Sequence, residues 1–238
     1  NRADLMQRQG FYPAPPGESE IMGLECAGEV VALGDSVTRY AIGDKVCALL
    51  GGGGYAEFAT ADEGSVLPVP DGFSMAQAAA LPEVFATAWL NLFIEAALVP
   101  GEKVIIHAGA SGVGTAAIQM CQAFGNPSFV TVGSAEKLAA CIALGAASGS
   151  NRHDGPFVTA AREFAGDAGV SVILDPVGGQ YLGDNLQLLG LGGRLVLIGL
   201  MGGMTAELGL AQLMMKRARI IGSTLRARPL QEKANVMA

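Results

Sequence analysis

The chain has 238 residues, of which half are hydrophobic and only 16% are charged, and its formal net charge is −7. This acidic balance argues against a partner that presents a phosphate backbone, so we expect no nucleic-acid partner. The apolar runs are short and broken by Gly, Pro or charged residues, which predicts no membrane span and no membrane partner. The four cysteines form no C-x-x-C pair, as is typical of reduced thiols, which predicts a cytoplasmic location.

Residues 1–86 consist of short β-like runs separated by turns. Gly, Asp and Pro punctuate the runs, a pattern that predicts a small β-rich domain such as a barrel or a sandwich. The expected strands lie within residues 25–34, 44–50, 55–61 and 65–70. The chain starts without Met, and its last two residues fall inside an expected helix, so we expect a fragment that lacks both ends.

From residue 87 onward, apolar strands alternate with helical stretches. The expected strands are residues 103–107, 128–132, 170–174, 194–198 and 219–221, and the expected helices are residues 112–124, 136–144, 182–189 and 208–217. Strands separated by helices of this length predict right-handed βαβ units. The expected fold class is therefore α/β, a doubly wound parallel sheet joined to a β-rich domain.

The stretch HAGASGVGTAAIQM, residues 107–120, lies between the first of these strands and its helix. Because 34 residues of the chain are glycine, the G-x-x-G-x-G pattern alone is weak. The strand before it and the helix after it indicate a dinucleotide-binding turn, with the helix N-terminus and the Ser111 hydroxyl facing a diphosphate. A plain tight turn is the alternative.

The residues after the second strand favour NADP(H). An NAD site usually has Asp or Glu at the end of that strand, but TVGSAEKL, residues 131–138, has Gly133 and Ser134 there. Its only acid, Glu136, is better placed as a first-turn residue of the following helix. Ser134, Lys137 and Arg152 are therefore expected to bind a 2′-phosphate, which makes NADPH the expected cofactor. For Lys137 and Arg152 the alternative is an ordinary solvated charge.

An ordered series of motifs runs nearly the whole length of the chain. It includes GLECAGEVVALG, AAALPEVFATAW, HAGASGVGTAAIQ, VGSAEKL, ILDPVGG and GRLVLIGLMGG. The chain resembles the zinc-free quinone oxidoreductase branch of the medium-chain dehydrogenase/reductase superfamily, most of all its p53-inducible quinone oxidoreductase-like group. The resemblance implies an incomplete GroES-like catalytic domain at residues 1–86, a Rossmann NADP(H)-binding domain at 87–226, and the start of a return to the catalytic domain at 227–238. It also implies a homodimer through Rossmann edge strands, with residues 218–226 as the expected edge.

The resemblance implies a set of site residues. Asn1 and Tyr12 match polar residues that line the family's cleft, so Tyr12 is expected to donate to the developing oxyanion with Asn1 assisting. A surface-loop role is the alternative for Tyr12. Arg152 stands where the group usually has tyrosine. The implied cofactor-binding residues are Thr87, Ser111, Gly112, Val113, Ser134, Lys137, Arg152, Gly178, Gly199, Leu200, Met201 and Leu225.

Leucine at position 24 predicts metal-free chemistry. Zinc enzymes of the superfamily carry Gly-His-Glu where this chain has Gly23-Leu24-Glu25, and leucine cannot ligate zinc. The only histidines are His107, which ends a buried strand and is expected to be structural, and His153, expected at the surface. The prediction is thus NADPH-dependent hydride transfer to a quinone or a similar conjugated carbonyl, because such acceptors need no Lewis acid. The alternatives are an alkene or enoyl reductase and a non-catalytic NADPH-binding protein.

Overall fold

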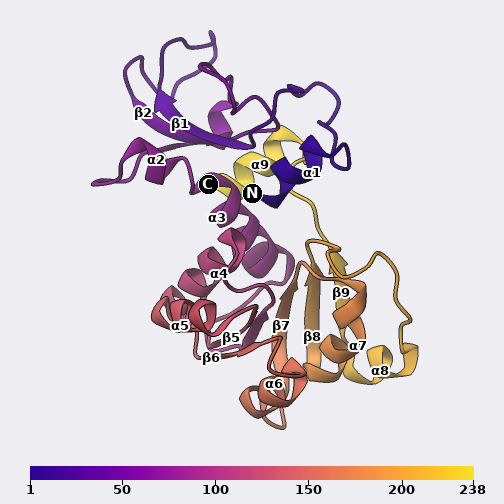
Figure 1. Cartoon of the computed structure of the whole chain (residues 1–238). Coiled ribbons are helices and arrows are strands. Elements are labelled where there is room, and N and C mark those ends of the chain that lie inside the picture. The colour runs from indigo at the N-terminus through magenta and orange to yellow at the C-terminus, as the bar shows by residue number, and fades with distance from the viewer. The chain divides into compact units, whose positions relative to one another are not determined.

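The structure is a computed structural model that describes residues 1–238. The chain divides into two compact units, drawn in Figure 1. The first unit comprises Asn1–Thr87 and Thr224–Ala238, and the second comprises Ala88–Ser223. None of the helices has both the length and the apolar character needed to cross a bilayer.

The first unit is built on a three-stranded antiparallel sheet with the order β1-β2-β3. Its strands are β1 (Glu25–Glu29), β2 (Lys45–Leu49) and β3 (Val66–Pro68). Ala48, Leu50 and Val66 form a small apolar core on this sheet. The helices are α1 (Arg2–Arg8), the 3-10 turn η1 (Glu63–Ser65), α2 (Met75–Ala78), α3 (Pro82–Trp89), which continues past the unit boundary, and α9 (Leu230–Met237).

Residues 55–61 form no strand, so that prediction is wrong. Tyr55 and Phe58 are 61% and 74% exposed, which shows that the apolar residues of this run do not face a core. A strand needs neighbouring backbone to pair with, and this segment pairs with none of the strands of the β1-β2-β3 sheet. The unit accordingly contains one small sheet where a barrel or sandwich was expected.

The second unit contains a six-stranded parallel sheet with the order β6-β5-β4-β7-β8-β9. Its strands are β4 (Val104–Ile106), β5 (Ser128–Val132), β6 (Ser148–Asn151), β7 (Val170–Asp175), β8 (Leu189–Leu197) and β9 (Arg219–Gly222). Its helices are the π-helix η2 (Leu90–Glu95), α4 (Gly112–Ala123), α5 (Ala135–Ala143), α6 (Phe157–Ala165), the 3-10 turn η3 (Gly179–Tyr181), α7 (Leu182–Leu188) and α8 (Leu210–Lys216). The predicted fold class, a Rossmann-type α/β sheet with a separate β-rich part, is confirmed.

The order of the strands locates the site. β4 is the first strand of the second unit, with β5 and β6 on one side and β7, β8 and β9 on the other. The chain adds β5 and β6 on one side of β4 and then crosses back to add β7 on the other side, so the strand order reverses between β4 and β7. In open α/β sheets, ligands bind beyond the carboxyl ends of the strands at such a switch point. All residues of β4 and β5 are buried, as expected of central parallel strands covered by helices on both faces.

Candidate functional site

The glycine turn connects the carboxyl end of β4 to α4, at the switch point. Ser111 is the N-cap of α4, and its Oγ accepts a hydrogen bond from the Gly114 N–H at 3.1 Å. Glycine is required at position 114, because a Cβ there would lie 2.5 Å from the carbonyl oxygens of Ala108 and Gly109. Ser111 and Gly112 are exposed, so the N-terminus of this twelve-residue helix is open to an anion.

The residues predicted to bind a 2′-phosphate lie at the carboxyl ends of β5 and β6, which pair in parallel. Ser134 is the N-cap of α5, and its side chain accepts a hydrogen bond from the Lys137 N–H at 3.2 Å, so both residues belong to the first turn. A Cβ on Gly133 would lie 3.6 to 3.8 Å from the guanidinium of Arg152, which therefore lies beside this turn. Lys137 and Arg152 are exposed. Ser134, Lys137 and Arg152 thus present one hydroxyl and two cationic groups around Gly133.

The loops after β7 and β8 are bound to each other. The Gly202 N–H donates to the Val177 carbonyl at 2.7 Å, and the Gly179 N–H donates to the Gly203 carbonyl at 3.0 Å. Gly178 has a φ of 82°, and a Cβ on it would lie 3.0 Å from Leu200 Cδ2. This packing brings together the predicted residues Gly178, Gly199, Leu200 and Met201, and the last two are 49% and 45% exposed.

Four predicted residues belong to the first unit. Asn1 donates through Nδ2 to Glu25 Oε1 at 2.9 Å. Thr87 lies on α3, and Leu225 is buried with 6% of its surface exposed. Tyr12 is half-buried, and the guanidinium of Arg226 lies 5.1 Å from its ring centroid.

The environment of Tyr12 keeps its hydroxyl protonated. Burial raises the pKa of Tyr12, the negative charge of Glu83 raises it further, and Arg226 opposes both. A tyrosine that is neutral over the physiological range can donate a hydrogen bond to a developing oxyanion. The proposed donor role of Tyr12 is therefore compatible with its surroundings.

Sequence reasoning missed a group of carboxyl side chains in the first unit. Both oxygens of Glu25 are engaged, since Oε2 accepts from the Glu83 N–H at 2.9 Å and Oε1 accepts from Asn1. Burial raises the pKa of Glu83 to about 7, and the charges of Glu25 and Asp4 add to the effect. Arg226 acts in the opposite direction. No pattern in the sequence could have shown this group, because the three acids are far apart in the sequence and only the tertiary structure brings them together.

This raised pKa predicts a pH-dependent stability. With a folded-state pKa near 7, above the ordinary value of 4.5, Glu83 binds its proton more tightly in the folded chain than in the unfolded chain. Its stabilising contribution is complete below about pH 4.5 and is lost as the pH rises through 7. We expect Glu83→Gln to raise the free energy of unfolding at pH 8 by about 2–3 kcal/mol and to leave it nearly unchanged at pH 4.5.

Urea unfolding at the two pH values measures this effect. Glu57→Gln is the control, because Glu57 is an exposed glutamate of the same unit. Equal stabilisation by Glu83→Gln at both pH values would show that the carboxyl proton is not responsible.

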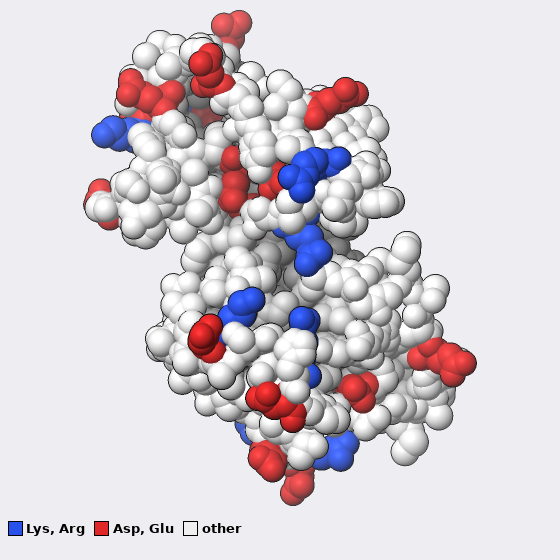
Figure 2. All heavy atoms as spheres, in the orientation of Figure 1, with Lys and Arg blue, Asp and Glu red and all other residues white.

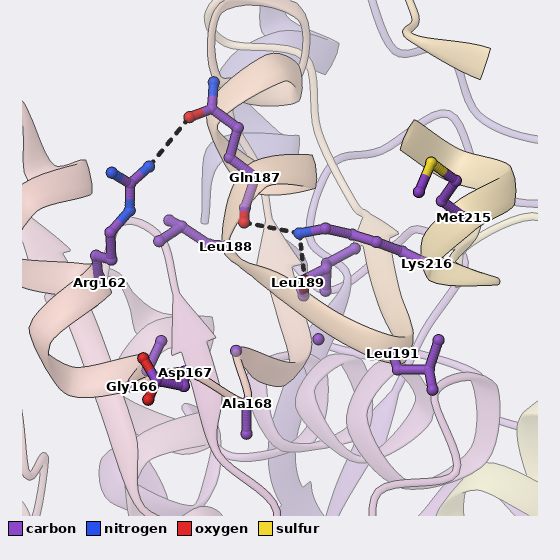
Figure 3. A pocket seen from close by; sticks show the side chains of 13 residues that line it. Arg162, Gly166, Asp167, Ala168, Gln187, Leu188, Leu189, Leu191, Met215 and Lys216 are labelled. Carbon is purple, nitrogen blue, oxygen red and sulfur yellow. Dashed lines mark hydrogen bonds between the residues drawn. The ribbon is translucent and has the colours of Figure 1, made fainter. Parts of the chain in front are cut away.

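A pocket of about 540 Å³ is lined by residues just before β7, by residues at the start of β8 and by the end of α8 (Figure 3). Lys216 points into the backbone at one side of it and donates to the carbonyls of Leu186, Gln187 and Leu189 at 2.8, 2.7 and 2.6 Å. Arg162 Nη2 donates to Gln187 Oε1 at 3.2 Å. All three ammonium hydrogens of Lys216 are thus used within the protein, and the pocket offers no free ammonium to an anion.

The donor set does not fit a zinc ion. No three His, Cys, Asp or Glu side chains of the chain are grouped so that they could hold a metal. Leu24, at the position where zinc enzymes have a histidine, is 2% exposed and part of the core. A tetrahedral catalytic zinc needs three protein ligands, and this triplet supplies one carboxylate at most.

Figure 2 shows one face of each unit with its charged side chains coloured. Acidic and basic groups are scattered among uncharged residues on the face shown and form no continuous basic tract. A protein that follows a nucleic-acid backbone generally presents such a tract.

A parallel sheet with a glycine turn at its switch point defines the class of Rossmann dinucleotide-binding proteins. Two family models match the chain. The model described as "Zinc-binding dehydrogenase" matches residues 112–238, and the model described as "Alcohol dehydrogenase GroES-like domain" matches residues 1–71. The chain belongs to the medium-chain dehydrogenase/reductase superfamily, as its motifs predicted.

Individual relatives come from two groups. Quinone oxidoreductase of Rattus norvegicus is 33% identical over 226 residues, which cover 94% of this chain and 68% of the rat protein. Polyketide synthase GfsB of Streptomyces halstedii is 38% identical over 202 residues, which cover 84% of this chain and 3% of that protein. The crystal structure of Escherichia coli quinone oxidoreductase complexed with NADPH has a TM-score of 0.84 at 27% identity and covers 99% of this chain and 73% of that one.

Proposed function

We propose that this chain is an NADPH-dependent, metal-free quinone oxidoreductase. The observation that carries the proposal is the arrangement at the end of β5, where Arg152 lies beside Gly133 and no acid takes the place of a ribose ligand. The quinone oxidoreductase relatives, one of them complexed with NADPH, support the same cofactor and substrate class. The substrate would be a small quinone or a similar conjugated carbonyl.

Most of the residues that would hold NADPH belong to the second unit. The open N-terminus of α4, with Ser111, Gly112 and Val113, would hold the diphosphate, because unpaired helix N–H groups favour an anion. Ser134, Lys137 and Arg152 would hold the 2′-phosphate. The other cofactor-binding residues of the proposal are Thr87, Gly178, Gly199, Leu200, Met201 and Leu225. When bound, NADPH supplies the hydride.

The protein would also orient the substrate that accepts the hydride and stabilise the charge that develops on it. The Tyr12 hydroxyl would donate a hydrogen bond to the oxygen that gains negative charge, and the Asn1 amide would help to orient it. No group of side chains in the chain is arranged to hold zinc, which is consistent with a substrate that accepts a hydride without a Lewis acid. We further propose a cytoplasmic enzyme that dimerises through β9, the last strand of the sheet, whose outer edge is unpaired within the chain.

The proposal is tested by mixing the purified chain with NADPH and an ortho-naphthoquinone and following the loss of NADPH absorbance. We expect quinone-dependent NADPH oxidation that a metal chelator does not reduce. Tyr12→Phe should lower kcat by about tenfold or more without weakening NADPH binding, because it removes only the hydroxyl donor. NADPH binding without oxidation by any quinone would reject the proposal and leave the second candidate below or a binding protein as the function.

A second candidate is an NADPH-dependent alkene or enoyl reductase. The 38% identity to a segment of a polyketide synthase is the observation that favours it. The same assay with an α,β-unsaturated thioester in place of the quinone separates the two candidates. A kcat/KM for the thioester well above that for every quinone tested would establish the second candidate and reject the first.

A further inference from the structure

Four buried polar side chains form a connected network beneath the switch point. They come from three neighbouring strands and one helix, namely Thr131 on β5, His107 directly after β4, Asp175 at the end of β7 and Asn185 on α7. Their exposed fractions are 3%, 1%, 0% and 0%. The sequence indicated only that His107 is a structural residue and gave no sign of its partners.

The hydrogen bonds of the network have one consistent direction. His107 Nε2 lies 2.7 Å from Asn185 Oδ1, and Asn185 Nδ2 donates to Asp175 Oδ2 at 2.9 Å. Because Asn185 presents its oxygen to the ring, His107 carries its proton on Nε2 and is a donor there. Its Nδ1 then accepts from the Thr131 hydroxyl at 3.0 Å. Burial lowers the pKa of His107, which keeps the ring neutral as this direction requires.

Each end of the network terminates on backbone N–H groups of a loop predicted to border the dinucleotide. At one end, the Ala108 N–H donates to Thr131 Oγ1 at 3.3 Å, where Ala108 begins the glycine turn with a left-handed φ of 54°. At the other end, the N–H groups of Val177 and Gly178 donate to Asp175 Oδ1 at 2.5 and 3.1 Å. The network thus spans from the turn after β4 to the loop after β7.

Burying a carboxylate away from water destabilises the folded state unless hydrogen bonds or charges within the protein compensate. Burial raises the pKa of Asp175, and the three hydrogen bonds donated to its oxygens oppose that effect because they favour the ionised form. An apolar side chain could fill the same space at lower cost, but it could not bind the two backbone N–H groups. The loop that these N–H groups belong to also binds residues 199–203, so Asp175 holds both loops in place.

We propose that His107, Asn185 and Asp175 are positioning residues that fix the loops carrying Gly178, Leu200 and Met201 relative to the diphosphate turn, and so govern affinity for the nicotinamide half of NADPH. This inference rests on the proposed function. It assigns no contact between the network and the cofactor. A fixed separation between two loops matters to a ligand that touches both and matters little to one that touches neither.

The test exchanges two members of the network. Asp175→Asn puts two amide NH₂ groups face to face, and Asn185→Asp puts two carboxyl groups face to face. The double variant Asp175→Asn/Asn185→Asp restores every donor to an acceptor, because the carboxylate introduced on α7 would accept from His107 and from the amide introduced at the end of β7. Asp167→Asn and Gln187→Glu make the same chemical changes at exposed positions and serve as controls.

Calorimetric titration of the chain with NADPH and with adenosine 2′,5′-bisphosphate gives the readout. We expect each single variant to bind NADPH roughly tenfold more weakly or worse, with the bisphosphate affinity within about threefold of the unaltered chain. The exchange variant should recover most of the loss. Should a single variant not fold, Thr131→Val, which removes one hydroxyl at the end of the network, is expected to weaken NADPH selectively.

Two outcomes would overturn the inference. One is equal weakening of both probes in every variant, since a purely structural role lowers the fraction of folded protein for both. The other is an exchange variant no better than the single variants. An unaltered chain that binds neither probe would instead refute the proposed function, so the two failures are distinguishable.

Discussion

The double variant Lys137→Ala/Arg152→Ala is expected to bind NADPH at least about 100-fold more weakly, while its affinity for NADH changes by about threefold or less. The two cofactors differ only in the 2′-phosphate. Each cation that contacts a phosphate contributes a charge-assisted hydrogen bond, and the two together amount to about 3 kcal/mol or more. Calorimetric titration of each cofactor gives both dissociation constants directly.

The control for this experiment is Arg162→Ala. Arg162 is an exposed arginine of the same unit, but it lies on α6 and binds Gln187 at the opposite edge of the sheet. It should leave both affinities unchanged. If the double variant lost equal affinity for NADPH and for NADH, the two cations would attract both cofactors through their charge in general and would not recognise the 2′-phosphate. The affinity of the Lys137→Ala/Arg152→Ala variant for NADPH should also depend less on salt concentration than that of the unaltered chain.

The substitution with the largest expected effect on stability is Arg226→Met. Arg226 is 4% exposed, and its guanidinium donates to the carbonyls of Gly51 and Tyr12 at 2.8 and 3.1 Å and to Gln7 Oε1 at 2.9 Å. Methionine fills similar space but leaves these three acceptors, which are buried or partly buried, without the Arg226 donor. We expect the free energy of unfolding of the first unit to fall by about 3–5 kcal/mol, measured by urea denaturation.

Arg228→Met is the matched control for this change, because it lies two residues further along the same segment. Its guanidinium binds the Thr224 carbonyl and Glu232, an exposed pair one helical turn apart, which should contribute about 1 kcal/mol or less. If the two variants were destabilised equally, Arg226 would not be the residue that holds the segments around it together.

Strands and helices with a clear local pattern could be predicted from the sequence. The apolar run at residues 128–132 is β5, and the stretch that follows the glycine turn is α4 to within one residue. Residues 157–165 were not predicted, although their apolar positions form the buried face of α6. Residues 55–61 were predicted wrongly, because alternation shows only that a segment suits a strand and not that a partner strand exists.

The candidate site was predictable where its residues follow a strand directly. Ser111, Ser134 and Arg152 could be placed because the carboxyl ends of parallel strands share one edge of a sheet. Glu83 and Asn185 could not be placed, because each meets its partners through the folding of distant segments. Asn185 lies 78 residues from His107 in sequence, and no local pattern connects them.

The sequence by itself determined the alternation of strands and helices, the glycine turn and the Gly133-Ser134 pair directly after the second strand, because these depend on residues within a few positions of one another. Only the tertiary structure decided which groups become neighbours. It buried Asp175 beside Asn185, raised the pKa of Glu83 by burying it and placing Glu25 and Asp4 near it, and brought Arg226 to Gly51 from 175 residues away. Burial and charge proximity are properties of the folded topology, and a linear pattern does not contain them.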